Sequence, residues 1–128
     1  GSLVAHAKPV ATTNQLAEAR KVVRDVYVDD RVKEYIVDVV FATREPDRKG
    51  MKDLAPLIEY GASPRASIAL NLTARAHAFL RHRGYVTPED IKAVGADVLR
   101  HRVILTYEAE EMTSEQVVRK LFEHIEVP

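Results

Sequence analysis

Apolar residues recur at helical spacing in five segments of this chain, and no segment shows the apolar–polar alternation of a β-hairpin. The five segments cover approximately residues 14–26, 30–44, 63–83, 88–99 and 113–124. We expect one small extended pair, which joins Tyr85–Val86 to residues 102–105. The pattern therefore predicts an all-α fold: a small helical bundle of about five helices that forms a single domain over residues 13–128.

Capping residues predict where these helices begin and end. Residues 12–14 and 29–30 carry side-chain oxygens that can accept hydrogen bonds from the unpaired N–H groups of the first two helices. Ser63 and Thr87 are favoured N-cap residues, and each is followed by a proline at the expected first helical position, where no hydrogen bond is lost. Gly84 is the expected end of the third helix.

The apolar stripe of each helix predicts the core. Alanines in the third helix allow a neighbouring helix to approach closely. For the second, third and last helices, we expect the following residues on the apolar face: Val32, Tyr35, Ile36, Val39 and Val40; Ile68, Leu72, Ala76, Phe79 and Leu80; Val117, Val118, Leu121 and Phe122.

Two segments lack helical periodicity. Residues 1–12 begin with Gly-Ser, which is typical of an expression scar, and we interpret them as a tag remnant and linker. Residues 45–62 form a connection that is long for a compact domain, and such connections are usually functional or mobile. Leu54, Leu57 and Ile58 either form a helical turn within it or hold it against the core.

Composition excludes several classes of function. Lys and Arg number 19, as do Asp and Glu, so the formal net charge is zero, whereas nucleic-acid-binding domains usually carry a basic excess. The chain has no cysteine, which excludes thiol chemistry and suits a cytoplasmic protein. No apolar run approaches the roughly 20 residues of a membrane span. The sequence also has no P-loop and no metal-binding histidine pair, so we expect neither a metal site nor catalysis by this chain alone.

One motif indicates binding: Gly61-Ala62-Ser63-Pro64-Arg65-Ala66. Arg65 is expected in the first turn of the third helix, where the positive end of the helix dipole disfavours a cation. This arrangement suits phosphate binding, because a guanidinium and the N–H groups of a helix start both attract anions. On physical grounds alone, an exposed arginine that binds nothing is the slightly better explanation.

The hexapeptide resembles the sensor 2 motif of MoxR-type AAA+ ATPases. The resemblance covers roughly residues 16–108, although residues 46–60 look like an insertion. Further elements of that family follow in order along the chain: Val26-Tyr27-Val28-Asp29-Asp30, Ala42-Thr43-Arg44, Arg83-Gly84-Tyr85-Val86-Thr87-Pro88-Glu89-Asp90-Ile91 and Val98-Leu99-Arg100-His101-Arg102.

The resemblance implies that the chain is the helical C-terminal lid of such an ATPase, without the nucleotide-binding core. Arg65 would then contact the γ-phosphate of ATP, while the core would hold most of the ATP and Mg²⁺. Gly61, Ser63 and Pro64 would shape the loop and the helix start. Arg102 becomes a candidate interface residue. The implied partners are the chain's own core, neighbouring subunits of a ring hexamer and von Willebrand A-domain proteins, in chaperone-like assembly.

Two other functions stay open. A stand-alone helical bundle that binds other proteins would share the fold and differ only in giving Arg65 no nucleotide role. A nucleic-acid-binding module is suggested by the turn at Gly84 between two helices, which superficially resembles a helix-turn-helix. The zero net charge and the acidic start of the following helix, at Glu89 and Asp90, argue against that module, because a recognition helix presents its N-terminal residues to DNA.

Overall fold

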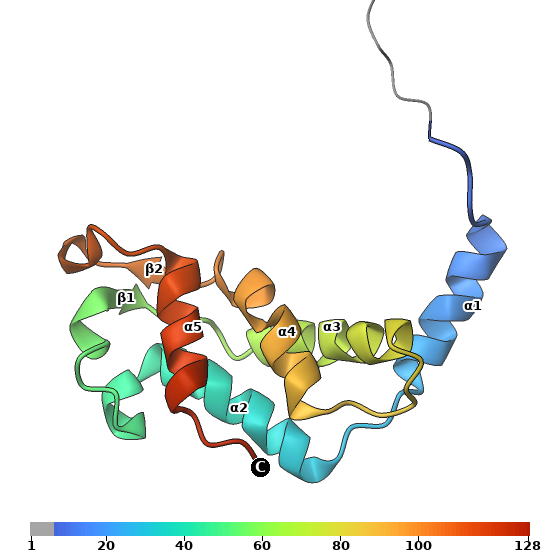
Figure 1. Ribbon diagram of the computed structural model, residues 1–128. Coiled ribbons are helices and arrows are strands. Elements are labelled where there is room, and N and C mark those ends of the chain that lie inside the picture. The colour runs from blue at the N-terminus through green and yellow to red at the C-terminus, as the bar shows by residue number, and fades with distance from the viewer. Residues whose placement is uncertain (1–6) are drawn as a thin grey trace, which may run out of the picture.

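Helices dominate the computed structural model, which describes residues 7–128 (Figure 1). The α-helices are α1 (Thr13–Arg24), α2 (Asp30–Arg44), α3 (Ala66–Leu80), α4 (Pro88–Leu99) and α5 (Ser114–His124). The described part also contains strands β1 (Ile58–Tyr60) and β2 (Ile104–Leu105) and 3-10 turns at Pro46–Lys49, Ala55–Leu57 and Tyr107–Ala109. The predicted all-α fold is confirmed. No helix among these residues has the length and apolar character to cross a membrane.

Side chains cap several helices where the sequence predicts it. The Thr12 hydroxyl accepts a hydrogen bond from the Gln15 N–H at 3.1 Å, and the Gln15 side chain accepts one from the Thr12 N–H at 2.8 Å. The side chains of Asp29 and Thr113 likewise accept N–H hydrogen bonds at the starts of α2 and α5. Each such cap stabilises its helix by about 1 kcal/mol. Residues 7–12, before α1, are exposed and form no regular structure, and the rest of the expected tag and linker lies outside the described residues.

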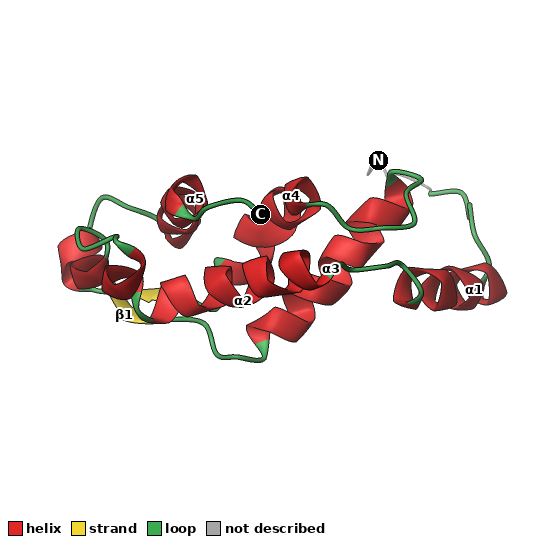
Figure 2. Cartoon of the chain, turned by 90° about the horizontal axis from the view of Figure 1, so that it is seen from below, coloured by secondary structure: helices red, strands yellow, loops and turns green. Residues whose placement is uncertain are grey.

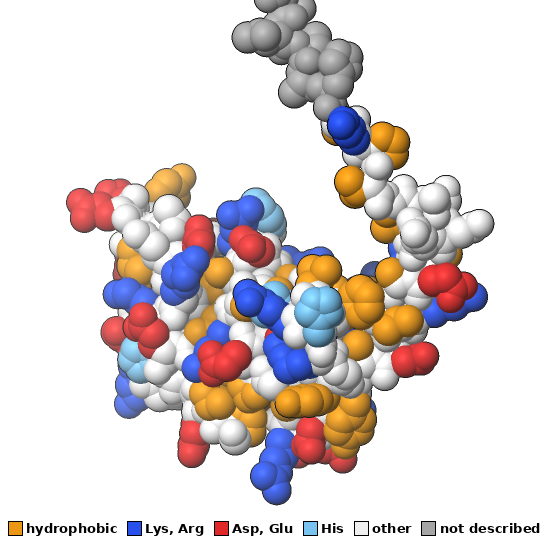
Figure 3. All heavy atoms as spheres, turned by 45° about the vertical axis from the view of Figure 1, so that its right-hand side comes forward, with side chains coloured by type: hydrophobic (Ala, Val, Ile, Leu, Met, Phe, Trp, Pro, Cys, Tyr) orange, Lys and Arg blue, Asp and Glu red, His pale blue; other side chains and the backbone are white. Residues whose placement is uncertain are grey.

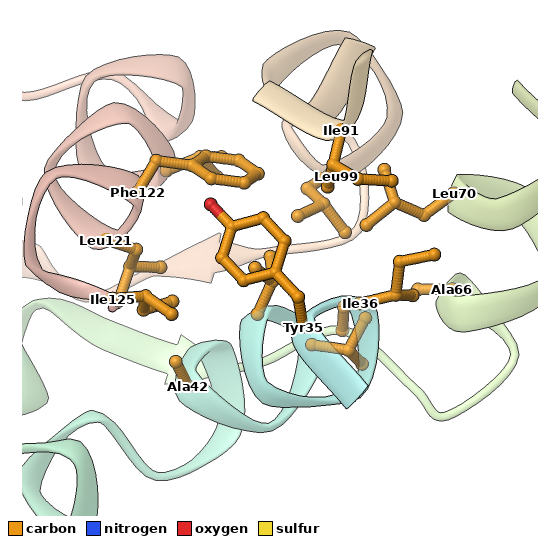
Figure 4. Close-up of a cluster of buried hydrophobic side chains, with 14 of the residues drawn as sticks. Tyr35, Ile36, Ala42, Ala66, Leu70, Ile91, Leu99, Leu121, Phe122 and Ile125 are labelled. Carbon is orange, nitrogen blue, oxygen red and sulfur yellow. The ribbon is translucent and has the colours of Figure 1, made fainter. Parts of the chain in front are cut away.

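The core forms where α2 packs against α3, α4 and α5. Figure 4 shows Tyr35 of α2 among Leu70 of α3, Leu99 of α4 and Phe122 of α5. The rings of Tyr35 and Phe122 lie 6.5 Å apart at 60°. Burial raises the pKa of the Tyr35 hydroxyl to about 12, with the charge of Glu89 as a second cause. Each large side chain buried here contributes about 1.5–3 kcal/mol, and the predicted inward residues of α2 and α5 are all buried.

The predicted inward face of α3 is wrong for Ile68, Leu72 and Leu80, whereas Ala76 and Phe79 are half-buried and Phe79 packs against the core. Ile68, Leu72 and Leu80 are 71%, 52% and 72% exposed. Three alanines at four-residue spacing, with Leu70 among them, let α3 lie close to α2 and α4, so Ile68, Leu72 and Leu80 remain on the outer side. The residues of α3 that are buried are Ala66, Leu70, Ala74 and Ala78.

Helix α1 lies at one end of the molecule, as Figures 1 and 2 both show, and has no buried residue. It contacts α3, and an apolar groove lined by Leu16, Val23, Leu72 and Leu80 runs between the two helices. The guanidinium of Arg75 donates a hydrogen bond to the carbonyl at the C-terminal end of α1. Positive charge is favourable there because of the helix dipole.

The extended pair differs from the prediction. β2 does occupy the expected segment, but it pairs antiparallel with β1, which belongs to the connection between α2 and α3. Tyr85 instead forms an isolated parallel bridge with Tyr27, in which the Tyr27 N–H donates to the Gly84 carbonyl at 2.9 Å. The connection thus contains both a helical turn and contacts that hold it to the core, since Leu54 is 1% exposed.

The end of α3 also differs from the prediction. The helix stops at Leu80, and His82, not Gly84, has the left-handed conformation, with φ 60°. The Arg83 N–H donates to the Ala78 carbonyl at 3.0 Å, which is the hydrogen bond of a Schellman motif. Glycine usually occupies this position, because a Cβ atom strains the left-handed conformation.

Replacing His82 with glycine should therefore stabilise the protein. We expect His82→Gly to raise the free energy of unfolding by about 0.5–1 kcal/mol, measured by urea denaturation. Arg81→Gly is the matched control, since Arg81 has φ of −92° and gains nothing from glycine. A His82→Gly variant no more stable than the parent would contradict this account.

Candidate functional site

The last turn of α2 holds the residues that lead into α3. Thr43 is fully buried, and its hydroxyl donates to the Val40 carbonyl at 2.7 Å and accepts from the Ala62 N–H at 2.9 Å. The backbone of Gly61 passes so close that a Cβ atom there would lie 2.3 Å from the Thr43 carbonyl oxygen. Arg44 Nη1 donates to the Ala62 carbonyl at 3.4 Å. These contacts hold the start of the motif in one position against α2.

Arg65 is exposed and directly precedes the first residue of α3, Ala66. The predicted helix start at Ser63 and Pro64 is therefore two residues too early. The Ser63 carbonyl, not its hydroxyl, is hydrogen-bonded to the Ala66 N–H, at 2.9 Å. Because this tight turn satisfies the N–H group through the backbone, no side-chain cap is needed.

The donors near Arg65 fit an anion, although not in the expected way. The N–H groups of Ala66, Ser67 and Ile68 already donate to carbonyls three residues earlier, so they offer less to a phosphate than a free helix start would. The exposed guanidinium of Arg65 is the main donor, and the guanidinium of Arg44 contacts the carbonyl of Ala62 in the segment just before it. Within residues 7–128, no group of acidic or histidine side chains could hold a metal ion. The two guanidiniums near this segment are cationic, so they suit an anion.

Arg102 lies on the exposed turn between α4 and β2, where its N–H donates to the Leu99 carbonyl at 2.9 Å. The neighbouring Arg100 is the C-cap of α4 and approaches Asp97 at 3.7 Å. Arg100 thus has a favourable position, because the helix dipole attracts a cation at a helix C-terminus.

A second cluster of titratable groups surrounds Asp90, and sequence reasoning missed it. Asp90 is completely buried, and Arg83 binds both of its carboxylate oxygens, at 2.6 and 2.7 Å. The Nδ1 atom of His77 lies 2.6 Å from one oxygen, and the Thr87 N–H lies 2.7 Å from the other. Since both oxygens are fully engaged, Asp90 joins α3 to α4 and has no capacity left for a substrate. Asp90 at the third position after a threonine cap indicated a capping box, but nothing in the sequence indicated His77.

The environment of Asp90 sets its ionisation. Burial by itself raises the pKa of Asp90, but the hydrogen bonds from Arg83, Thr87 and His77 outweigh burial and hold that pKa well below its usual range. Asp90 is therefore ionised near neutral pH and forms a buried ion pair with Arg83.

The family model and the related proteins that match this chain point to the same family. The family model described as the AAA lid domain matches residues 52–121. The chain is 39% identical over 124 residues to Chaperone MoxR1 of Mycobacterium tuberculosis, and the match covers 95% of this chain and 33% of that protein. It is also 39% identical over 79 residues to Protein MoxR of Paracoccus denitrificans, covering 59% of this chain and 23% of that protein.

A solved structure shares the fold. The crystal structure of a "putative ATPase" from Cytophaga hutchinsonii superimposes with a TM-score of 0.85 at 41% identity, covering 90% of this chain and 36% of that one. The chain thus spans about a third of the length of MoxR1 and of this structural neighbour.

The close approach at Gly61 predicts a strong effect of one added methyl group. Gly61→Ala should lower the free energy of unfolding by about 1–3 kcal/mol, because the Cβ atom meets backbone that cannot move aside. Gly84→Ala is the matched control, since a Cβ atom added at Gly84 would meet no other atom within 4 Å. Urea denaturation of both variants tests this, and equal stabilities would contradict a tight contact at Gly61.

Removing the charge of Asp90 should destabilise the protein near neutral pH. Asp90→Asn is expected to lower the free energy of unfolding by about 3–5 kcal/mol, because it leaves the partly buried Arg83 without its counterion. The exposed neighbour Glu89 gives the control variant Glu89→Gln, which should change stability little.

The pH dependence follows from the lowered pKa of Asp90. A carboxylate with a lowered folded-state pKa stabilises fully above its unfolded-state pKa of about 4, and this stabilisation is lost as the pH falls further. The difference between the parent and Asp90→Asn should therefore shrink between about pH 5 and pH 2. A difference that stayed constant over this range would show that folding does not lower the pKa of Asp90.

Proposed function

Because this chain belongs to the AAA lid domain family, as the lid of a MoxR-type AAA+ ATPase, we propose that it senses ATP bound to the nucleotide-binding core and moves in response. The observation that carries this proposal is the exposed guanidinium of Arg65, presented by a segment that Thr43 and Gly61 hold against α2. In this role Arg65 is the sensor 2 arginine.

The physical basis is a difference in affinity between two nucleotide states. A charge-assisted hydrogen bond from Arg65 to the γ-phosphate exists with ATP and is lost after hydrolysis. Because a ligand shifts a conformational equilibrium only through such a difference, this contact favours the closed lid in the ATP state. The contacts of Thr43 with residues 61–62 support this role, because they attach the backbone shortly before Arg65 to α2.

The chemistry of hydrolysis belongs to the core. The phosphate cradle and the Mg²⁺ ligands of an ATPase are supplied by motifs that this sequence lacks. Bound ATP would supply the γ-phosphate that Arg65 contacts, while this chain holds only the guanidinium in place. We therefore propose that the chain alone does not hydrolyse ATP and binds it with millimolar affinity at best.

The proposed partners are the core of the same ATPase and neighbouring subunits of a ring, with Arg102 at one of these interfaces. The exposed apolar side chains Ile68, Leu72 and Leu80 and the groove beside α1 support a protein partner on that side. Action on von Willebrand A-domain proteins in chaperone-like assembly is proposed from the family resemblance alone.

The proposal predicts that Arg65 controls turnover and not folding. In an ATPase that joins this lid to its core, Arg65→Ala should lower the rate of ATP hydrolysis by roughly 10- to 100-fold, because one charged contact to the reacting phosphate is lost. The thermal unfolding temperature should not change, since the Arg65 side chain is exposed.

Arg31 supplies the matched control. It is also an exposed arginine at the start of a helix, α2, so Arg31→Ala removes the same charge in a similar setting. We expect it to leave turnover unchanged, and the isolated lid should show no turnover at all. An Arg65→Ala enzyme as active as the parent would exclude the sensor role.

A further inference from the structure

The β1–β2 pair brings together two sequence features that the nucleotide role leaves unused: the connection over residues 45–62 and the acidic stretch that follows β2. Tyr60 pairs with Ile104, and Ile58 pairs with Leu105. An irregularity between Ile58 and Tyr60 shifts the register, so Tyr60 and Ile104 both face outward while Ile58 and Leu105 are half-buried.

The outward face of this pair is apolar and exposed. Tyr60 and Ile104 are 63% and 55% exposed, and Tyr107, in the 3-10 turn just after β2, is 92% exposed. We call these three residues the ribbon face. The surface is ordered and not a loose loop, because the Thr106 hydroxyl donates to the Pro56 carbonyl at 2.6 Å and the Thr106 N–H donates to the Leu57 carbonyl at 2.9 Å. Exposed apolar groups held in a fixed arrangement are typical of a binding surface.

The segments that carry the ribbon face are acidic, although the exposed Lys52, Arg65 and Arg102 lie directly beyond their ends. The segments over residues 53–64 and 103–118 contain no Lys, Arg or His, although the whole chain is neutral. Four exposed glutamates lie in these segments, and none of them is in an ion pair among the described residues: Glu59, Glu108, Glu110 and Glu111. Figure 3 shows acidic and hydrophobic side chains side by side at the end of the molecule away from α1, with basic side chains nearby.

We propose that the ribbon face is a docking surface for a basic segment of another protein that carries an exposed aromatic or aliphatic side chain. The apolar centre would bury that side chain, and the acidic rim would attract the basic residues around it, which gives specificity and a faster encounter. Nucleic acids and anionic membranes are repelled by the same rim. This role is independent of the nucleotide role, because it needs neither Arg65 nor ATP.

A peptide titration tests the proposal. The probe is a short synthetic peptide in which lysines flank a phenylalanine pair, added to the isotope-labelled chain and followed by two-dimensional amide NMR. Chemical shifts should change over residues 57–60 and 103–112. Tyr107→Ala, or the triple variant Glu108→Gln, Glu110→Gln and Glu111→Gln, should weaken binding by roughly tenfold or more. Raising the salt concentration to about 0.5 M should also weaken it.

The controls separate this surface from general charge attraction. A second triple variant, Glu34→Gln, Glu123→Gln and Glu126→Gln, removes the same charge from exposed positions elsewhere and should leave binding unchanged. A peptide with glutamates in place of the lysines should not bind, and one with alanines in place of the phenylalanines should bind more weakly. The proposal is overturned if the shifts spread over the whole acidic surface, if both triple variants weaken binding equally, or if the ribbon residues do not shift at all.

Discussion

The buried carboxylate of Asp90 is the constraint on which the arrangement of α3 and α4 depends. A charge without solvent is tolerable only when opposite charge and hydrogen bonds surround it. Here Arg83 supplies the charge, while His77 from α3 and Thr87 at the start of α4 supply further hydrogen-bonding groups. These requirements fix the angle at which α4 leaves α3. Since α2 and α5 pack against those helices, the position of the core follows from the same cluster.

Local signals in the sequence predict the elements well. Threonine and aspartate caps before α1, α2, α4 and α5 give the correct helix starts, because a cap is a contact between residues three or fewer positions apart. The predicted buried face of α2 is also correct, since only one side of this helix faces the core. The family of the chain can also be identified from short motifs that follow one another in the sequence. One of these motifs contains Arg65, which is exposed at the start of α3.

Longer-range features are not accessible from local signals. The burial of the alanine face of α3 depends on how closely α2 and α4 approach, whereas hydrophobicity alone favours Ile68. The strand that pairs with β2 cannot be predicted from nearby residues, because β1 lies far earlier in the chain. In the candidate site, no local signal shows that Thr43 reaches forward to Ala62, or that the tight turn at Ser63 uses the N–H groups expected to bind an anion. Residues that act through their own chemistry are therefore easier to find than those that hold the backbone in place.

The contact between Gly61 and Thr43 has a consequence for how this fold can be altered. It fixes the far end of the connection, while the near end continues directly from α2. Because Met51 and Leu54 are buried between these ends, only an exposed point of the connection can take extra residues without moving α3. Gly50, exposed and with open space around it, lies within that stretch. A fluorescent label or a small inserted domain at this point should therefore leave residues 61–65 undisturbed.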